Sequence, residues 1–128
     1  MEKQHKLLVV DDEPDILYIT VRTLQKYFLV DPFTSPIKAL AHFEKHANEY
    51  TLVLSDIRMP GMSGMEFLNV VKLIRPDIPI LVMTAYSASD DEIVGAIPWI
   101  AKEEIVHKPF RALEICGAVK KILKITSS

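Results

Sequence analysis

Four polar positions in this sequence directly follow short apolar runs, where a side chain is presented at the end of a buried strand. They are Asp11-Asp12 after residues 6–10, Asp56 after 51–55, Thr84 after 79–83 and Lys108 after 105–107. Grouped carboxylates repel one another unless a cation lies among them, and Mg²⁺ prefers such oxygen ligands. A lysine and a hydroxyl beside that ion would neutralise and hydrogen-bond a phosphoryl group. One carboxylate could then attack phosphorus and become an acyl phosphate.

Each of these groups also has an ordinary structural explanation. Asp11 and Asp12 could cap the following helix, and Asp56 could close an Asx turn. The Thr84 hydroxyl could bond its own backbone, and Lys108 could be a solvated charge at a strand end. Because four separate strand ends carry residues that suit one phosphoryl site, the combined pattern favours the functional interpretation.

The elements that position these groups alternate along the chain. Apolar runs bounded by turn residues predict buried strands at 6–10, from 28 onward, at 51–55, at 79–83 and at 105–107. Helical spacing predicts helices at 14–27, 36–47, 63–75, from 89 to a break near 98, and at 110–124. This alternation predicts a doubly wound α/β fold, a parallel sheet with helices on both faces. The carboxyl ends of its strands share one edge, where such folds bind ligands.

Proline and apolar spacing give more specific predictions within this fold. Pro32 lies inside the second strand, and because proline cannot donate to a ladder, that strand is predicted at an edge of the sheet. The inward faces predicted for two helices are Ile37, Leu40, Ala41 and Phe43 or Ala47 in the second, and Met65, Leu68, Val71 or the stem of Lys72, and Ile74 in the third. The single cysteine, Cys116, is predicted to be a core residue of the last helix.

The bulk composition excludes several classes of protein. The 128 residues suit one domain, and the net charge of −2 argues against direct nucleic-acid binding. No apolar segment resembles a signal peptide or a membrane span. One cysteine excludes a disulfide framework. Together these features predict a cytoplasmic protein. The four histidines, His5, His42, His46 and His107, share no metal-ligand spacing that indicates a site, and we expect them to be surface or strand residues.

Four sequence motifs together carry a resemblance to a known family. They are Val10-Asp11-Asp12-Glu13-Pro14, Asp56-Ile57-Arg58-Met59-Pro60-Gly61-Met62-Ser63-Gly64, Met83-Thr84-Ala85 and Lys108-Pro109-Phe110. With these motifs the sequence resembles a two-component response-regulator receiver domain of the CheY-like kind over residues 1–128. The resemblance implies a flavodoxin-like (βα)5 fold whose five parallel strands have the order 2-1-3-4-5.

The resemblance also implies a role for each residue of the site. Asp56 would accept a phosphoryl group from a phosphohistidine of a sensor histidine kinase or a phosphotransfer protein. Mg²⁺ would be held by Asp11, Asp12, Asp56 and the backbone carbonyl of Arg58. Lys108 would pair with the phosphoryl group, Thr84 would hydrogen-bond it, and Ala85 would offer its amide. Arg58 and Tyr86 would overhang the group, and the Lys108–Pro109 bond would be cis.

By the same resemblance, a downstream protein would bind the face formed by the fourth helix, fifth strand and fifth helix, and phosphorylation could be linked to dimerisation. Receivers usually place Tyr or Phe three residues before the lysine, where this chain has Ile105, which has no ring or hydroxyl to swing. The segment 97–103 also replaces the usual small Gly-Ala pair. Trp99 in that segment either belongs to an altered signalling surface or fills a gap in the core.

Other functions compete with the receiver interpretation. A haloacid-dehalogenase-like phosphatase also uses an aspartate nucleophile with Thr or Ser, Lys and Mg²⁺, but it needs a second aspartate two residues later, where this chain has Arg58. A receiver-like interaction module that is no longer phosphorylated would lack part of the site, whereas all five site residues are present here. We therefore expect no turnover of an external substrate, only catalysis of the chain's own phosphorylation and dephosphorylation.

Overall fold

Five strands and four longer helices alternate in the computed structural model, which describes residues 5–57, 59, 62–85, 93, 95, 97–108 and 112–124. The elements are β1 (Lys6–Val10), α1 (Pro14–Leu24), β2 (Leu29–Phe33), α2 (Pro36–His46), η1 (Ala47–Glu49), β3 (Leu52–Asp56), α3 (Gly64–Ile74), β4 (Ile80–Ala85), η2 (Lys102–Glu104), β5 (Ile105–Lys108) and α5 (Ala112–Ile122). Within these described ranges, no helix has the length and apolar character that crossing a bilayer requires.

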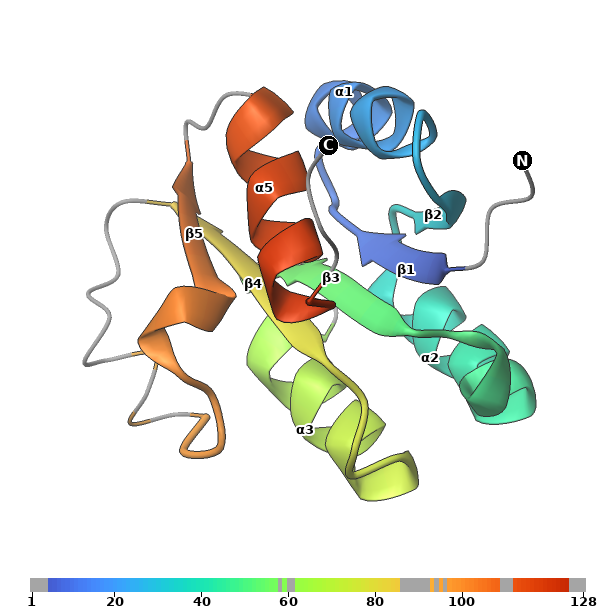
Figure 1. Ribbon diagram of the computed structural model, residues 1–128. Helices are drawn as coiled ribbons and strands as arrows, with labels where there is room; N and C mark the ends of the chain where they lie inside the picture. The colour runs from blue at the N-terminus through green and yellow to red at the C-terminus, as the bar shows by residue number, and fades with distance from the viewer. Residues whose placement is uncertain are drawn as a thin grey trace.

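The strands form one parallel sheet with the order β2-β1-β3-β4-β5. Figure 1 shows helices on both sides of this sheet, with α1 beside α5 on one face and α2 beside α3 on the other. Parallel pairing needs a crossover between successive strands, and the helices supply it. The predicted doubly wound fold and its strand order are confirmed.

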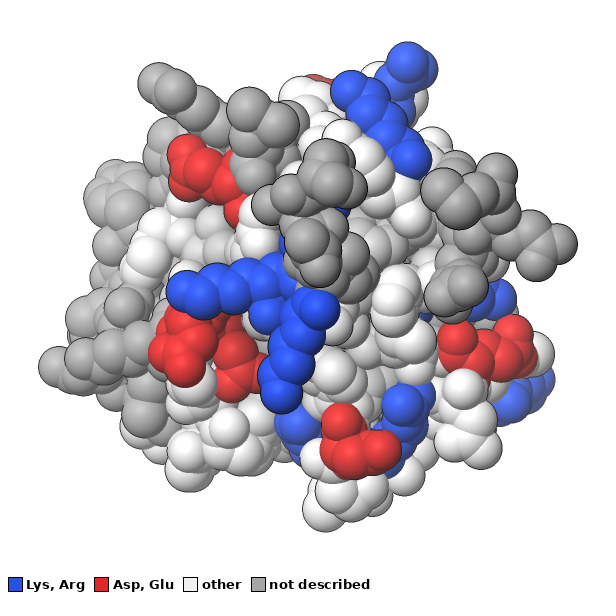
Figure 2. Space-filling view, in the orientation of Figure 1, with Lys and Arg blue, Asp and Glu red and all other residues white. Residues whose placement is uncertain are grey.

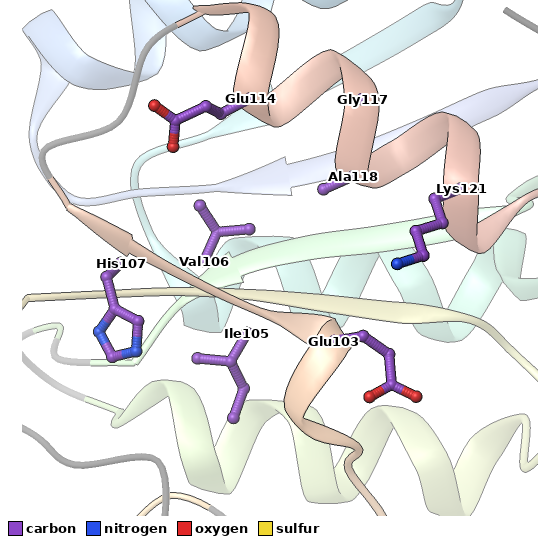
Figure 3. A pocket seen from close by; sticks show the side chains of 8 residues that line it. All are labelled: Glu103, Ile105, Val106, His107, Glu114, Gly117, Ala118 and Lys121. Atoms are coloured by element: carbon purple, nitrogen blue, oxygen red, sulfur yellow. The ribbon is translucent and has the colours of Figure 1, made fainter.

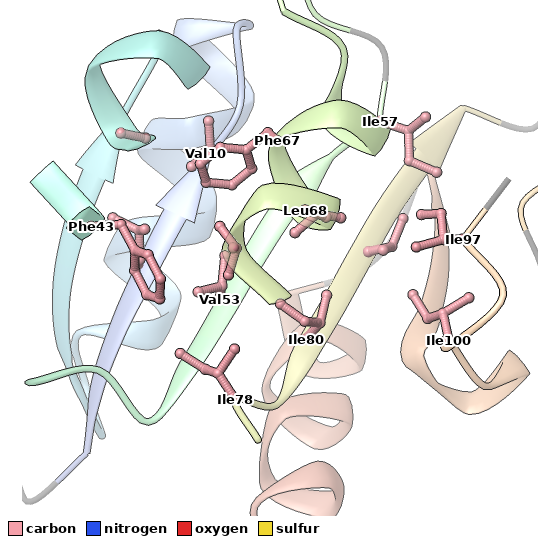
Figure 4. Close-up of a cluster of buried hydrophobic side chains, with 14 of the residues drawn as sticks. Val10, Phe43, Val53, Ile57, Phe67, Leu68, Ile78, Ile80, Ile97 and Ile100 are labelled. Atoms are coloured by element: carbon pink, nitrogen blue, oxygen red, sulfur yellow. The ribbon is translucent and has the colours of Figure 1, made fainter. Parts of the chain in front are cut away.

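Side chains that alternate along the strands build two cores, one on each face of the sheet. Val10 and Val53 point to the face covered by α2 and α3, where they join Phe43 and Phe67 (Figure 4). Leu8 belongs to the same cluster. The other face, under α1 and α5, buries a separate set: Leu7, Val9, Leu17, Val21, Leu24, Leu52, Leu54, Ile115, Cys116 and Val119. The period of two residues in a strand explains why one apolar run serves both cores.

The second strand lies at the edge of the sheet, as its proline predicted. Pro32 pairs in register with Val9 of β1, and no second strand flanks β2 in the described structure. Cys116 is also buried, as predicted, and burial raises the pKa of its thiol. A thiol held in this form is a weak nucleophile, which agrees with a packing role.

The inward faces predicted for α2 and α3 were partly wrong. In α2 the buried residues are Pro36, Ala39 and Phe43, whereas Ile37 is 56% exposed. In α3 Phe67 is buried and Ile74 is exposed. In each helix the predicted buried face is rotated about the helix axis by about one residue from the observed one. Apolar residues also occur beside the buried stripe, and docking on the sheet selects which stripe is buried. The predicted start of a helix at 89–92 lies outside the described residues.

Candidate functional site

The carboxyl ends of β1 and β3 bring four carboxylates together. Val10 pairs in register with Ser55, so Asp11 and Asp56, the residues that follow these two positions, lie side by side at this edge of the sheet. One carboxylate oxygen from each of Asp11, Asp12, Glu13 and Asp56 lies within 4.8 Å of the others. This is a donor set of hard oxygens with several negative charges, which fits a divalent cation such as Mg²⁺. The predicted grouping of Asp11, Asp12 and Asp56 is therefore present.

Asp56 is the last residue of β3, and only 5% of its surface is exposed. Its Oδ1 accepts a hydrogen bond from the backbone N–H of Ile57 at 2.7 Å. The Ser55 hydroxyl donates to the Asp56 carbonyl at 2.8 Å. These bonds orient both the carboxylate and its backbone, so Asp56 presents a fixed oxygen geometry at the strand end.

The segment after Asp56 is held by a close approach of the start of α3. The Gly64 N–H donates to the Ile57 carbonyl at 2.6 Å, and Ser63 caps the helix by accepting from the Glu66 N–H. A Cβ on Gly64 would lie 2.0 Å from the Asp56 carbonyl oxygen and 2.5 Å from the Ile57 Cα. Only glycine fits here, because a real Cβ never approaches backbone atoms that closely. Met59 adds a buried anchor in the same segment.

Asp11 is fully buried, and its Oδ1 accepts a hydrogen bond from the Glu13 N–H at 3.0 Å. The N-cap residue of α1 is Glu13, and its side chain makes no capping hydrogen bond. Neither aspartate is therefore the N-cap residue of α1. The sequence interpretation assigned no role to Glu13, although three consecutive acidic residues after a strand were a signal that a third side chain could reach the same site.

Thr84 and the backbone of Lys108 lie at the ends of the next two strands. Thr84 is 1% exposed and pairs in register with His107, and Lys108 ends β5 opposite Ala85. The Ile57 N–H donates to the Met83 carbonyl, which joins the end of β3 to the residue before Thr84. The Lys108 and Ala85 side chains, Arg58, Tyr86 and the Lys108–Pro109 bond lie outside what the structure describes.

The segment that replaces the usual small pair packs against α3. The Trp99 indole N–H donates to Asn69 Oδ1 at 2.8 Å, and the Lys72 ammonium lies 5.1 Å from the Trp99 ring centroid. Trp99 is half-buried against the core on the α2 and α3 side, Ile100 is buried, and Pro98 is exposed. These contacts support the interpretation in which Trp99 fills space in the core. Ile105 is also buried, beside Val82.

Comparisons with known proteins agree with this geometry. A family model described as the response regulator receiver domain matches residues 7–120. Sporulation initiation phosphotransferase F of Bacillus subtilis (strain 168) is 33% identical over 128 residues, covering 96% of this chain and 97% of that protein. Regulatory protein VanRc of Enterococcus gallinarum is 32% identical over 120 residues, covering 93% of this chain. The chain spans 50% of that regulator's length.

A solved structure gives the same result for the fold. The response regulator receiver domain protein from Clostridium thermocellum superposes with a TM-score of 0.84 at 27% identity and covers 94% of each chain. These matches are to receivers, so the haloacid-dehalogenase-like phosphatase is not favoured. The family match over residues 7–120, the sheet order and the grouped carboxylates show that this chain belongs to the response regulator receiver domain family, the phosphoacceptor domains of two-component systems.

Proposed function

We propose that Asp56 is the residue that accepts the phosphoryl group and that residues 1–128 act as one receiver domain. A carboxylate oxygen of Asp56 attacks phosphorus, the bond from phosphorus to the donor's imidazole nitrogen breaks, and an acyl phosphate forms. The observation that carries this proposal is the fixed carboxylate of Asp56 at a strand end, among three other carboxylates. Its nucleophilic oxygen needs no proton removed, so positioning and charge neutralisation are the main tasks of the surrounding residues.

We further propose that Asp11, Asp12, Asp56 and the carbonyl of Arg58 hold Mg²⁺, and that Glu13 contributes negative charge beside them. Bound Mg²⁺ supplies positive charge that offsets repulsion between the carboxylates and an incoming phosphoryl group. Burial of Asp11 and its hydrogen bond from the Glu13 N–H keep the carboxylates ordered before any ion binds. The Glu13 side chain is more exposed than Asp11, so an indirect contact through water suits it better than direct ligation.

The residues on β4 and β5 complete the proposed phosphoryl site. The buried Thr84 hydroxyl hydrogen-bonds a phosphoryl oxygen, the Ala85 amide offers a second donor, and the Lys108 ammonium pairs with the negative charge. Strand register supports this assignment, because Thr84 and Lys108 end neighbouring strands at the same edge of the sheet as Asp56. The domain then catalyses only its own phosphorylation and dephosphorylation, with Arg58 and Tyr86 tuning the lifetime of the acyl phosphate.

The proposed donor is a phosphohistidine on a sensor histidine kinase or a phosphotransfer protein. Exposed apolar side chains on α1, among them Tyr18 at 61% and Ile19 at 55%, lie on the helix that begins beside the site. They give a donor protein an apolar surface to contact while its histidine approaches Asp56. Location in the cytoplasm, where such donors present their phosphohistidine, stays a prediction.

The proposed surface for a downstream protein, or for a phosphorylation-linked dimer, includes β5 and α5 together with the fourth helix. An open groove of about 450 Å³ lies between β5 and α5. Figure 3 shows Ile105 and His107 pointing to one side of β5 and Val106 toward α5, with Glu114 and Lys121 along the helix. Since β5 contains the partner of Thr84 in register, a change at the phosphoryl site has a direct route to this groove.

The distribution of charge supports a protein partner over nucleic acid. On the described part of the face in Figure 2, Lys and Arg side chains are interspersed with Asp and Glu. A nucleic-acid interface normally shows a continuous basic stripe. The net charge of −2 points the same way.

The test is covalent labelling of the intact protein. Incubation with acetyl phosphate or phosphoramidate and Mg²⁺ is expected to add one phosphoryl group, detected by intact mass, and Asp56→Asn is expected to remove the adduct. Asp77→Asn is the matched control, because the Asp77 side chain is 80% exposed and pairs with the Arg75 side chain on the surface. An adduct that persists in Asp56→Asn would overturn the assignment.

The proposed Mg²⁺ ligands are tested separately, by the rise in melting temperature that Mg²⁺ causes when it binds the folded protein. We expect Asp12→Asn to abolish most of this rise. Glu13→Gln is expected to weaken Mg²⁺ binding by less than about tenfold, which corresponds to about 1.4 kcal/mol. A rise of normal size in Asp12→Asn would place the ion elsewhere.

A further inference from the structure

We propose that α2 carries a second metal site, formed by His42 and His46, for a transition-metal ion such as Zn²⁺. The carboxylates beside these two histidines are Asp31 and Glu49. Both contact Lys6, which begins β1, whereas Asp11 follows the end of that strand. The site is therefore separate from the carboxylates that would hold Mg²⁺, and the proposal does not depend on phosphorylation of Asp56.

The spacing of the two histidines places both imidazoles on one face of a helix. Residues four apart in an α-helix are neighbours, and two histidines at this spacing can bind one metal ion, a spacing to which the sequence interpretation gave no weight. The rings of His42 and His46 stack with centroids 4.5 Å apart and planes inclined by 29°. Their side chains are 36% and 40% exposed, so an ion reaches them from solvent.

A carboxylate lies against each imidazole. His46 Nδ1 is hydrogen-bonded to Glu49 Oε2, and His42 Nε2 lies 3.9 Å from Asp31 Oδ2. Metal-bound histidines commonly use one ring nitrogen for the ion and the other for such a carboxylate, which fixes the ring and raises its basicity. The contacts leave His42 Nδ1 and His46 Nε2 for an ion, with waters completing the coordination.

The charge of this cluster favours a cation. Asp31 and Glu49 carry two negative charges, and Lys6 contributes one positive charge, 3.4 Å from Asp31 and 3.2 Å from Glu49. Tyr50 donates its hydroxyl to Asp31, which keeps that carboxylate beside His42.

The choice of metal follows from the ligands. Imidazole nitrogen suits Zn²⁺, Co²⁺, Ni²⁺ and Cu²⁺, whereas Mg²⁺ prefers oxygen ligands and retains several waters. The two sites of this domain therefore differ in ligand chemistry: carboxylates at the ends of β1 and β3, imidazoles on α2. Excess Mg²⁺ can be used to saturate the first without filling the second.

The experiment is a Zn²⁺ titration by calorimetry of the intact chain in excess Mg²⁺, repeated with Co²⁺ followed by visible absorption. We expect one ion per chain, and a loss of affinity of about tenfold or more in His42→Ala and in His46→Ala. His107→Ala is the matched control, because it removes an exposed histidine from β5 at the other edge of the sheet. Circular dichroism of each metal-free variant checks its fold.

Two results would overturn the proposal. One is Zn²⁺ affinity that is unchanged in both His42→Ala and His46→Ala while the fold is retained. The other is binding that disappears in Asp12→Asn, which would assign the ion to the carboxylates. Neither outcome bears on phosphorylation of Asp56, so the labelling experiment and this one fail independently.

Discussion

The edge of the sheet that carries the proposed phosphoryl site has two halves, and they are built in different ways. Around β1, β3 and the start of α3, backbone groups and short polar side chains hold the site, and Gly64 lies against the Asp56 carbonyl with no space between them. Around β4 and β5, large apolar side chains such as Ile97, Ile100 and Ile105 fill the space beside the sheet. Backbone contacts tolerate almost no change, whereas side-chain packing accepts different residues of suitable volume.

This difference explains where the chain departs from the usual receiver pattern. The motif around Asp56 matches the pattern, since the contact at Gly64 allows no alternative residue. The segment 97–103 departs from it, and Trp99 compensates by packing on the core and bonding Asn69. Ile105, at the position where the resemblance places an aromatic residue, is apolar and buried, so we expect any movement there to be a change of packing and not the rotation of a ring out to solvent.

The largest effect is expected for Gly64→Ala. The added Cβ would lie 2.0 Å from the Asp56 carbonyl oxygen, so the start of α3 must shift. We expect a loss of about 2–3 kcal/mol in the free energy of unfolding by urea, and slower labelling of Asp56. Gly117→Ala on α5 is the matched control, because its Cβ would meet nothing within 4 Å. Alanine loses less conformational entropy than glycine when a helix forms, so Gly117→Ala should raise the free energy of unfolding by about 0.5–1 kcal/mol. Equal effects at both glycines would contradict the comparison.

A smaller effect is expected at Trp99, on the side held by packing. Trp99→Ala removes a half-buried ring and its bond to Asn69, and we expect a loss of about 2 kcal/mol in the free energy of unfolding. Trp99→Phe keeps most of the ring and should lose about 1 kcal/mol. Both variants should still be labelled on Asp56. If Trp99→Ala unfolds at the urea concentration of the wild type, the ring contributes nothing to the core, and the surface interpretation gains support.

The smallest effects are expected for two helix caps that differ in their distance from the site. Ser63 accepts from the Glu66 N–H at 3.1 Å at the start of α3, and Ser35 accepts from the Lys38 N–H at 3.2 Å at the start of α2. Replacement of either by alanine should lower the free energy of unfolding by about 1 kcal/mol. Only Ser63→Ala should slow labelling by acetyl phosphate, because only α3 starts against the Asp56 segment. Equal labelling rates in the two variants would show that this helix start does not position Asp56.

Local patterns in the sequence were sufficient for the fold class and for the carboxylates of the site. Apolar runs, proline positions and acidic residues at strand ends predicted the doubly wound sheet, the edge position of β2 and the grouping of Asp11, Asp12 and Asp56, whereas the strand order followed from the resemblance to receiver domains. They failed for Ile37, which is exposed although it lies beside the buried stripe of α2. A helix presents apolar residues over more than one stripe, and only docking on the sheet selects which stripe is buried.

The sequence by itself determined which residue types lie at the carboxyl edge of the sheet, because turns and strand ends depend on residues that are close together in the chain. Contacts between distant segments were decided only by the tertiary structure. Glu13 reaches the carboxylates because β1 and β3 end side by side, and Trp99 meets Asn69 across thirty positions of sequence. Likewise, His42 faces Asp31 only once α2 lies beside β2, whereas the contact of His46 with Glu49, three residues later, is local. Such distances depend on how the elements pack, which no local pattern of residues specifies.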